Sequence, residues 1–309
     1  MNYTLNQLRI FLKVVEQKSI TKASEELHLT QPAVSIQIKN FQDQFDIPLL
    51  EKIGRQIQVT NFGEEVADSC RVILEEIEKV ENRKMAYLGH ITGKLQVSVV
   101  STGKYVMPFF FSEFMEKYPG IQLNMDVTNK SKVVRSLERN DVDFALVSVL
   151  PKGFAVEHTT LMENNLFLVA KKDSSGKRKI SSPKELEKMT LLFRENGSAT
   201  RMAMEEYLKK NKVQVNRSME LATNEAIKQA VLAGLGCSIM PIIGIRNELR
   251  DGELEIIELN GLPMATDWNL IWLKSKRLSP AATAYLAYIE DKKDEIIKTH
   301  FSWYSRFLA

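Results

Sequence analysis

The chain has few of the side chains from which metal centres and redox sites are built. Its 309 residues include only 2 cysteines, Cys70 and Cys237, which lie in different segments and cannot form a metal cluster by themselves. The 4 histidines are dispersed and show no ligand spacing such as His-Glu-x-x-His. The sequence therefore predicts no metal site, and it favours small apolar fillers over redox centres for both cysteines.

Signals for catalysis, export and membrane insertion are also missing. The sequence has no glycine-rich phosphate loop and displays no catalytic pair, so we expect no catalytic residue, no cofactor and no enzymatic activity. The N-terminus lacks an apolar core long enough for a signal peptide, and no run approaches the length of a membrane span. Together with the low cysteine content, these absences predict a cytoplasmic protein without a membrane partner.

Residues 19–39 are the most informative stretch of the chain. They predict a helix, a short turn and a second helix over about residues 20–39. Thr21 is the expected N-cap of the first helix. Thr30 is expected to cap the second helix, with Pro32 in its first turn, where the missing N–H costs nothing. This arrangement is typical of a DNA-reading helix-turn-helix, and the alternative is an ordinary helical hairpin inside a core.

The second of these helices has two contrasting faces. An apolar stripe is expected to pack inward, and it consists of Val34, Ile38, Phe41 and Phe45. The opposite face carries short polar groups near its start, which suit base-edge and phosphate contacts in the major groove. The predicted DNA contacts on this helix are Thr30, Gln31, Pro32, Ser35, Ile36 and Lys39.

The flanking segments complete a winged helix-turn-helix over residues 1–60. An amphipathic helix is predicted at about residues 5–17, with Leu8, Phe11, Leu12 and Val15 facing inward. Two short alternating runs between residues 48 and 60 flank Gly54 and Arg55, as in a small hairpin. Arg55 would stand at the tip of this wing, where its cation could reach phosphates or the minor groove.

The DNA-binding unit carries little net charge, which bears on how many copies must act together. Residues 1–62 contain seven Lys and Arg against six Asp and Glu, and the whole chain is +3. Because phosphate neutralisation supplies most nonspecific affinity, a single unit should bind DNA poorly. We therefore expect two or more units to be held together.

A proline-free helix predicted over residues 61–89 offers a means of association. Its apolar positions alternate spacings of four and three, as in a coiled coil, and its other positions are mostly charged. The seam consists of Val66, Cys70, Ile73, Ile77, Val80 and Tyr87. The alternative is that this stripe packs on its own domain. A dimer would imply a double-stranded DNA site with two-fold symmetry.

Beyond a hinge at residues 89–93, strands and helices alternate and predict an α/β domain over residues 93–300. We expect two lobes, the first formed by residues 93–161 and 267–300 and the second by residues 162–266. Crossings near residues 161–166 and 264–268 would join them, as in periplasmic binding proteins. The last ten residues are strongly aromatic and are expected to pack on this body or on a neighbouring subunit.

Ligands of α/β sheets sit beyond the carboxyl ends of the strands, and this rule selects candidate effector contacts. Hydroxyl, amide and guanidinium groups at these ends favour a small anion. The candidates are Ser101, Thr102, Asn129, Ser148, Ser198, Thr200, Arg201 and Thr223, with Ser148 expected to end the third strand. Taken singly, each hydroxyl could be only a helix cap, and Arg201 could bridge to a nearby Glu. As a set they favour a binding site.

The motifs of the N-terminal part resemble those of LysR-type transcriptional regulators. The resemblance rests on Leu-x-x-Phe, Ser-Ile-Thr-Lys-Ala-Ser, Thr-Gln-Pro-Ala-Val-Ser-x-Gln-Ile, Pro-Leu-Leu-Glu-Lys and Val-Thr-x-x-Gly, and it extends over the whole chain. It implies a DNA-binding regulator whose dimers pair into a tetramer under the control of a small molecule, with RNA polymerase as a further partner. Many relatives carry Arg where this chain has Ile36, which could instead touch a thymine methyl group.

The run from Phe193 to Arg201 also resembles regulators of carbon-fixation operons, whose ligands tend to be small phosphorylated or carboxylated metabolites. Peroxide-sensing relatives need a pair of cysteines in the effector half, and this chain has only Cys237 there. Two other functions remain open. One is a ligand-independent DNA-binding or architectural protein, and the other is a binding-protein-like enzyme with an appended DNA-binding unit.

Overall fold

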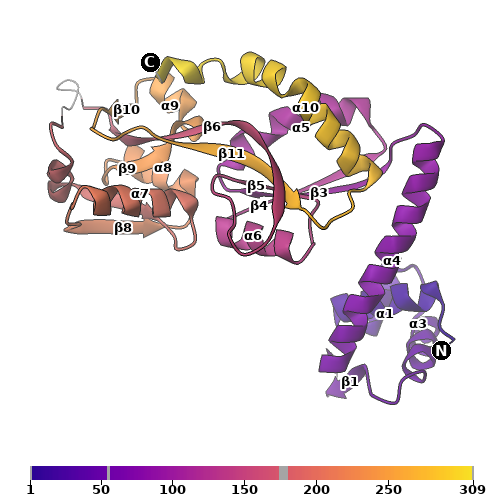
Figure 1. Ribbon diagram of the computed structural model, residues 1–309. Coiled ribbons are helices and arrows are strands. Elements are labelled where there is room, and N and C mark those ends of the chain that lie inside the picture. The colour runs from indigo at the N-terminus through magenta and orange to yellow at the C-terminus, as the bar shows by residue number, and fades with distance from the viewer. Residues whose placement is uncertain (1, 54–55, 174–179, 308–309) are drawn as a thin grey trace. The chain divides into compact units, whose positions relative to one another are not determined.

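The computed structural model describes residues 2–53, 56–173 and 180–307. The chain divides into two compact units, Met1–His90 and Ile91–Ala309, which we describe separately (Figure 1). No helix within the described ranges is long and apolar enough to cross a membrane.

The first unit is a winged helix-turn-helix followed by a long helix. Its elements are α1 (Leu5–Gln17), α2 (Ile20–Glu26), α3 (Gln31–Gln42), β1 (Leu50–Ile53), β2 (Gln56–Val59) and α4 (Asn61–Tyr87). The strands β1 and β2 pair antiparallel and form the predicted hairpin, although Arg55 lies outside the described residues. Apolar side chains of α1 and α3 form one core with the start of α4.

Two details of the helix-turn-helix differ from the sequence-based expectation. The N-cap of α2 is Ser19, whose hydroxyl accepts the Lys22 N–H, and not Thr21. Helix α3 ends at Gln42, so Phe45 is not part of it. Phe45 is still half-buried against Phe41, with ring centroids 5.2 Å apart. The other members of the predicted stripe, Val34, Ile38 and Phe41, are buried as expected.

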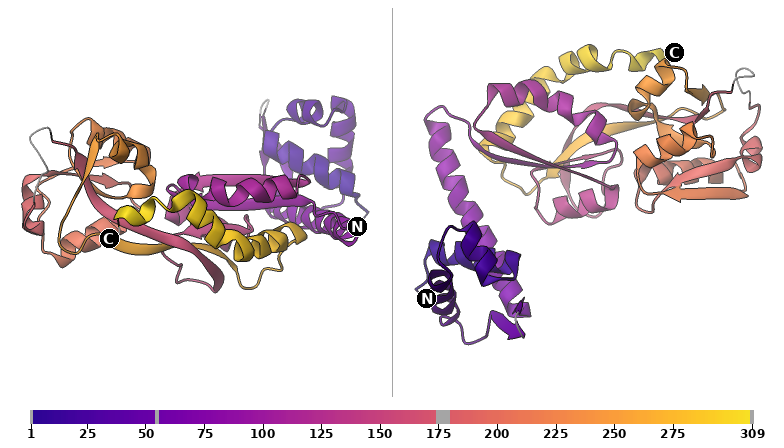
Figure 2. Two further views of the ribbon diagram at one scale, coloured as in Figure 1. Left: turned by 90° about the horizontal axis from the view of Figure 1, so that it is seen from above. Right: turned by 180° about the vertical axis from the view of Figure 1, so that it is seen from behind.

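In the second unit, the first lobe is a sheet covered on both faces. Strand β3 lies between β4 and β5, and all three are parallel. Helices α5 and α10 cover one face and α6 covers the other (Figures 1 and 2). The elements are β3 (Gly93–Val100), the 3-10 helix η1 (Gly103–Tyr105), α5 (Met107–Lys117), β4 (Ile121–Thr128), α6 (Lys130–Glu138), β5 (Phe144–Val147) and α10 (Pro280–Phe301).

The second lobe is built on a parallel pair of strands and on antiparallel strands of the main sheet. Strand β7 pairs parallel with β8, while β9 and β10 both pair with β6. The elements are η2 (Pro183–Lys188), β7 (Thr190–Arg194), α7 (Ala199–Lys210), β8 (Arg217–Leu221), α8 (Asn224–Leu232), β9 (Ser238–Pro241), η3 (Ile242–Gly244), α9 (Arg246–Arg250) and β10 (Leu254–Ile257). Helix α9 and strand β10 are short elements that periodicity did not reveal.

The connection between the lobes is a pair of long strands. Strand β6 (Val156–Lys171) and strand β11 (Met264–Leu273) pair antiparallel, and both run without a break through the expected crossings. Their register shifts once, between Trp268 and Asn269. The two-lobed architecture is therefore confirmed, and its junction is a β-ribbon.

Candidate functional site

The face of α3 that was predicted to meet DNA is exposed. Thr30, Gln31, Pro32 and Lys39 are exposed, Ile36 is 57% exposed, and Ser35 is half-buried. Thr30 caps the helix as predicted, because its hydroxyl accepts the Ala33 N–H at 3.4 Å. The opposite side of the helix is closed by the core. The exposed face of α3, which carries polar side chains and the apolar Ile36, is therefore free to enter a groove of DNA.

Charge on this face is not neutralised within the described part of the chain. Lys39 forms no ion pair with any residue that the structure describes. Lys13, on α1, instead binds Glu16 at 2.7 Å and Glu26 at 2.9 Å, and these hydrogen bonds raise the pKa of its ammonium group. Lys39 is therefore the better placed of the two to neutralise a phosphate.

The seam predicted on α4 divides into a covered part and an open part. Cys70 is 3% exposed in the core of the first unit, and burial raises the pKa of its thiol, which keeps it protonated. Further along the helix, Ile73 is 39% exposed, Val80 62% and Tyr87 93%. An exposed stripe of this kind on a long helix is typical of an association surface.

The candidate effector residues of the first lobe gather at one edge of its sheet. Val100 on β3 pairs with Thr128 on β4, and Val99 pairs with Leu146 on β5. Since the strands are parallel, the residues that follow them lie side by side, namely Ser101, Asn129 and Ser148. Ser148 was expected to end the third strand, but β5 ends one residue earlier.

Two side chains of the second lobe meet Ser101. Arg194 Nη1 and Asn224 Nδ2 each donate a hydrogen bond to the Ser101 hydroxyl oxygen, both at 3.1 Å. Arg194 is 3% exposed, and its guanidinium also binds the Glu195 carboxylate at 2.8 and 3.0 Å. Because the Ser101 oxygen already accepts twice, its own proton remains available to a ligand. Asn224 Oδ1 is buried and has no partner among the described residues.

A second approach between the lobes involves Gly197, which has a φ of 86°. A Cβ atom at this position would lie 2.7 Å from Ser131 Oγ, at the start of α6. The neighbouring Ser198 is 4% exposed and begins α7 without a side-chain cap hydrogen bond. Asn129 caps α6 by accepting the Lys132 N–H at 3.1 Å. Gly197 thus lies directly against the start of α6 in the other lobe.

The structure does not bring every predicted residue to this contact. Thr102 is buried beside Ser101, and Thr200 is half-buried in the first turn of α7. Thr223 is exposed and caps α8 by accepting the Ala226 N–H at 3.0 Å. The remaining candidate, Arg201, is bound elsewhere.

Arg201 makes the bridge to neighbouring Glu residues that the sequence offered as an alternative to ligand contact. Its guanidinium binds Glu205 at 2.7 Å, Glu220 at 2.5 Å and the backbone oxygen of Arg194 at 2.8 Å. Hydrogen bonds to the two carboxylates raise the pKa of Arg201. The side chain lines a groove between α7 and β8 and has no bond to Ser101.

Sequence reasoning missed the second-lobe partners of Ser101. Arg194 ends β7 and Asn224 begins α8, so the strand-end rule that selected their neighbours could have selected both. It also missed Tyr105, whose hydroxyl donates to Glu225 Oε2 at 3.2 Å across the lobes. Burial and the nearby Glu225 carboxylate raise the pKa of Tyr105 to about 12.

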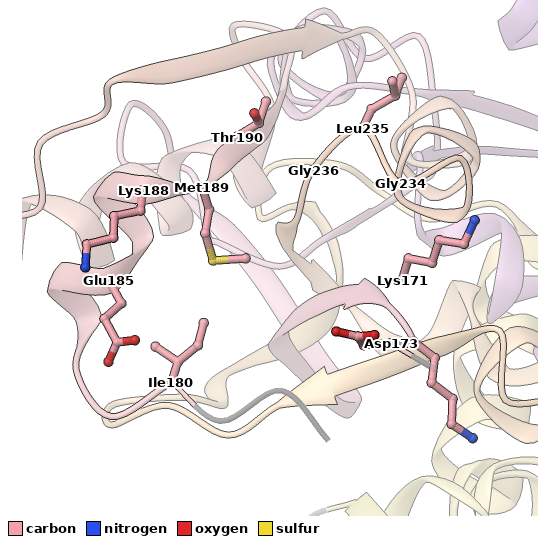
Figure 3. A pocket seen from close by; sticks show the side chains of 11 residues that line it. Lys171, Asp173, Ile180, Glu185, Lys188, Met189, Thr190, Gly234, Leu235 and Gly236 are labelled. Atoms are coloured by element: carbon pink, nitrogen blue, oxygen red, sulfur yellow. The ribbon is translucent and has the colours of Figure 1, made fainter. Parts of the chain in front are cut away.

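A pocket in the second lobe has a different character. This opening has a volume of about 660 Å³ and is lined by Lys171, Lys188, Gly234 and Gly236 among others. Figure 3 shows the lining side chains. The Lys171 and Lys188 side chains point away from each other on opposite sides of the opening, so they do not converge on one anion. The Ser101 contact is the stronger candidate for ligand recognition.

Each of the two units matches the model of a known protein family. Residues 5–64 match the model of the bacterial regulatory helix-turn-helix protein, lysR family, and residues 89–294 match the model of the LysR substrate binding domain. The chain belongs to the LysR family. This LysR-type protein is a DNA-binding transcriptional regulator, as the sequence motifs predicted.

Three relatives show how this LysR-type regulator compares with characterised ones. The RuBisCO operon transcriptional regulator of Allochromatium vinosum is 37% identical, with 94% of this chain and 96% of the relative covered. The CcmR regulatory domain of Synechocystis PCC6803, solved in complex with 2-PG, is 29% identical with a TM-score of 0.62, covering 65% of this chain and 98% of that domain. CbnR, solved full-length with its target DNA, is 21% identical with a TM-score of 0.69, covering 93% and 99%, and supports the fold alone. The resemblance to carbon-fixation regulators is thus confirmed.

Proposed function

We propose that this regulator, rather than acting as an enzyme, responds to a small anionic metabolite bound between its two lobes. The bonds from Arg194 and Asn224 to Ser101 carry this proposal, because they bring a cation, an amide and a hydroxyl to one place. The likeness to a regulatory domain bound to 2-PG (2-phosphoglycolate) supports an anion of that class. The proposed contacts are Ser101, Thr102, Asn129, Ser148, Arg194, Ser198 and Asn224.

For DNA, we propose that α3 enters the major groove. Gln31 and Ser35 would reach base edges, Ile36 would contact a thymine methyl group, and Thr30, Pro32 and Lys39 would meet the backbone. Arg55 would add a wing contact. Two DNA-binding units joined through α4 would read a double-stranded DNA site with two-fold symmetry. The regulator would act on chromosomal DNA, in the cytoplasm.

The response would follow from preferential binding of the metabolite to one arrangement of the lobes. A ligand shifts an equilibrium only by the difference between its affinities for the two states. Lobe closure would then change how dimers pair into a tetramer, and with it the separation of the DNA-binding units. RNA polymerase is the partner through which that change would alter transcription.

The effector site is tested by titrating 2-phosphoglycolate into the full chain in a calorimeter. We expect Arg194→Gln to weaken binding by about tenfold or more, because a hydrogen bond to a charged group is lost. Arg250→Gln is the control, since that guanidinium is exposed, pairs with Asp251 and has no bond to Ser101 or Arg194 among the described residues, and the affinity of this variant should stay within about twofold. Equal losses in the two variants would contradict the proposed site. Failure of wild type to bind this and related anions would favour a ligand-independent DNA-binding protein.

A further inference from the structure

The C-terminal end of the chain contacts more than the lobe from which it emerges. Helix α10 packs on the first lobe, where the Phe301 ring lies 5.3 Å from that of Phe109 and 6.3 Å from that of Phe110, both on α5. After α10 the chain continues into a short 3-10 helix, η4 (Tyr304–Phe307). Figures 1 and 2 show this end of the chain lying over the second lobe, near α9.

A hydrogen bond and a cation–π contact hold this terminal segment in place. The Tyr304 hydroxyl oxygen accepts the backbone N–H of Asn165 at 2.6 Å, and both residues are buried, at 3% and 2% exposure. The guanidinium of Arg246, on α9 of the second lobe, lies 5.1 Å from the centre of the Trp303 ring, which is a cation–π contact. Arg306 and Phe307 then line a groove with residues of β10.

The hydrogen bond between Asn165 and Tyr304 matters because of where Asn165 lies in β6. Asn165 lies in β6 at the point where that strand leaves the first lobe, opposite Ala265 of β11. Strands β6 and β11 carry the described backbone between the lobes ahead of α10, and a two-stranded ribbon twists more readily than a broad sheet. A third link, fixed to α10 at one end and to β6 and α9 at the other, resists such twisting.

We propose that residues 303–307 form a strap that sets the angle between the lobes and so positions Arg194 and Asn224 over Ser101. Tyr304 and Trp303 are positioning residues in this scheme, because they act through the lobes and do not touch the candidate effector site. The proposal of a strap depends on the proposed function only for the predicted change in effector affinity. Its effect on lobe geometry can be measured without any ligand.

The test compares two Tyr→Phe variants of the full chain. Tyr304→Phe removes the oxygen that holds Asn165. Tyr288→Phe is the matched control, since the Tyr288 hydroxyl is buried on α10 and has no hydrogen-bond partner among the described residues. Spin labels at exposed Glu138 on α6 and exposed Lys210 on α7 report the distance between the lobes, with unlabelled protein in excess to suppress signals between subunits.

We expect Tyr304→Phe to broaden and lengthen the distance distribution without ligand, and Tyr288→Phe to leave it unchanged. The concentration of 2-phosphoglycolate at half-saturation should rise by about three- to tenfold in Tyr304→Phe alone, as the loss of one buried hydrogen bond predicts. Arg246→Ala should shift the distribution in the same direction, and Arg246→Lys, which keeps a cation over Trp303, should restore it.

An unchanged distance distribution in both Tyr304→Phe and Arg246→Ala would overturn the strap, even if the melting temperature fell, because the segment would then only stabilise the fold. If wild type fails to bind the anion but Tyr304→Phe still changes the distance, the strap stands and the proposed effector class falls. A chain that ends at Ser302 adds a third measurement, expected to give the broadest distribution.

Discussion

Ser101 and Arg194 are joined by a 3.1 Å hydrogen bond between the carboxyl ends of strands in two different lobes. The charge of Arg194 is balanced by Glu195 of its own lobe, so separating the lobes would not leave a buried cation without a counter-ion. At Ser101, separation would lose the bond from Arg194, on the order of 1.5–3 kcal/mol for a charged donor, and the neutral bond from Asn224, on the order of 1 kcal/mol. A ligand anion that replaces or bridges these bonds can therefore bias the arrangement of the lobes at moderate cost.

The first prediction concerns Gly197. Alanine at this position would strain a backbone with φ of 86° and place its Cβ 2.7 Å from Ser131 Oγ. We expect Gly197→Ala to lower the free energy of unfolding by about 2 kcal/mol, because alanine is strained at this φ and the Ser131 hydroxyl must turn away from the new Cβ. Gly234→Ala is the control, with a similar φ of 79° but a nearest Cβ neighbour at 3.5 Å. Urea unfolding should show a loss of about 1 kcal/mol for the control, and equal losses would contradict a close contact at Gly197.

A second prediction concerns the pH dependence of Tyr105. Its pKa is raised to about 12, so between about pH 10 and 12 the unfolded chain loses this proton while the folded chain retains it. The stability associated with the neutral hydroxyl is complete below pH 10 and is lost as the pH rises toward 12. Tyr105→Phe should be about 1 kcal/mol less stable than wild type at pH 8, because its bond to Glu225 is absent. Urea unfolding at pH 8–11 should show this deficit shrinking as the pH rises, and a constant deficit would refute the assignment.

A third prediction concerns Ile36, which is 57% exposed on the face of α3 proposed to meet DNA. Ile36→Arg adds a cation there and should strengthen binding to a nonspecific duplex, with the salt dependence of binding growing by about one phosphate contact. Ile47→Arg adds the same charge at a site of similar exposure, 52%, outside α3. Fluorescence anisotropy at several salt concentrations should show the steeper slope for Ile36→Arg. Identical slopes would mean that this face is not the one that lies on DNA.

The fourth prediction concerns the exposed part of α4. Val80 belongs to the predicted seam and Val72 does not, yet their exposures are similar, at 62% and 58%. Val80→Lys should weaken dimerisation by about tenfold or more, because it places a charge in an apolar interface, whereas Val72→Lys should have little effect. Sedimentation equilibrium gives both dissociation constants. Equal effects would show that the predicted seam is not where the subunits meet.

Much of the fold could be predicted because its elements are long and strongly periodic. The bounds of α1 match the expectation, and Thr30 caps α3 as expected. Ser19 and Thr21 are both good N-cap residues, so the sequence alone does not distinguish them. In the structure α2 begins at Ile20, and Ser19 is its N-cap. The aromatic end was expected to pack on the body or on a neighbouring subunit, and Tyr304 packs on the body. Its bond to Asn165 joins residues 139 positions apart and leaves no local signal.

In the candidate site, too, some features could be predicted from the sequence and others could not. The rule about strand ends placed Ser101, Asn129 and Ser148 together, because parallel pairing makes this edge a property of the topology. It could not separate Arg194 from Arg201, which lie seven residues apart in one motif. That distinction depends on Glu205 and Glu220, which engage one guanidinium, and on Ser101 from the other lobe, which engages the other.

The uninterrupted course of β6 and β11 limits how this body can move. A loop would let one lobe swivel gradually, but paired strands resist bending because neighbouring backbone hydrogen bonds must change together, and the register of this pairing shifts only between Trp268 and Asn269. Twisting between the lobes should consequently concentrate at this register shift, where the ladder is already interrupted, rather than spread along the whole ribbon.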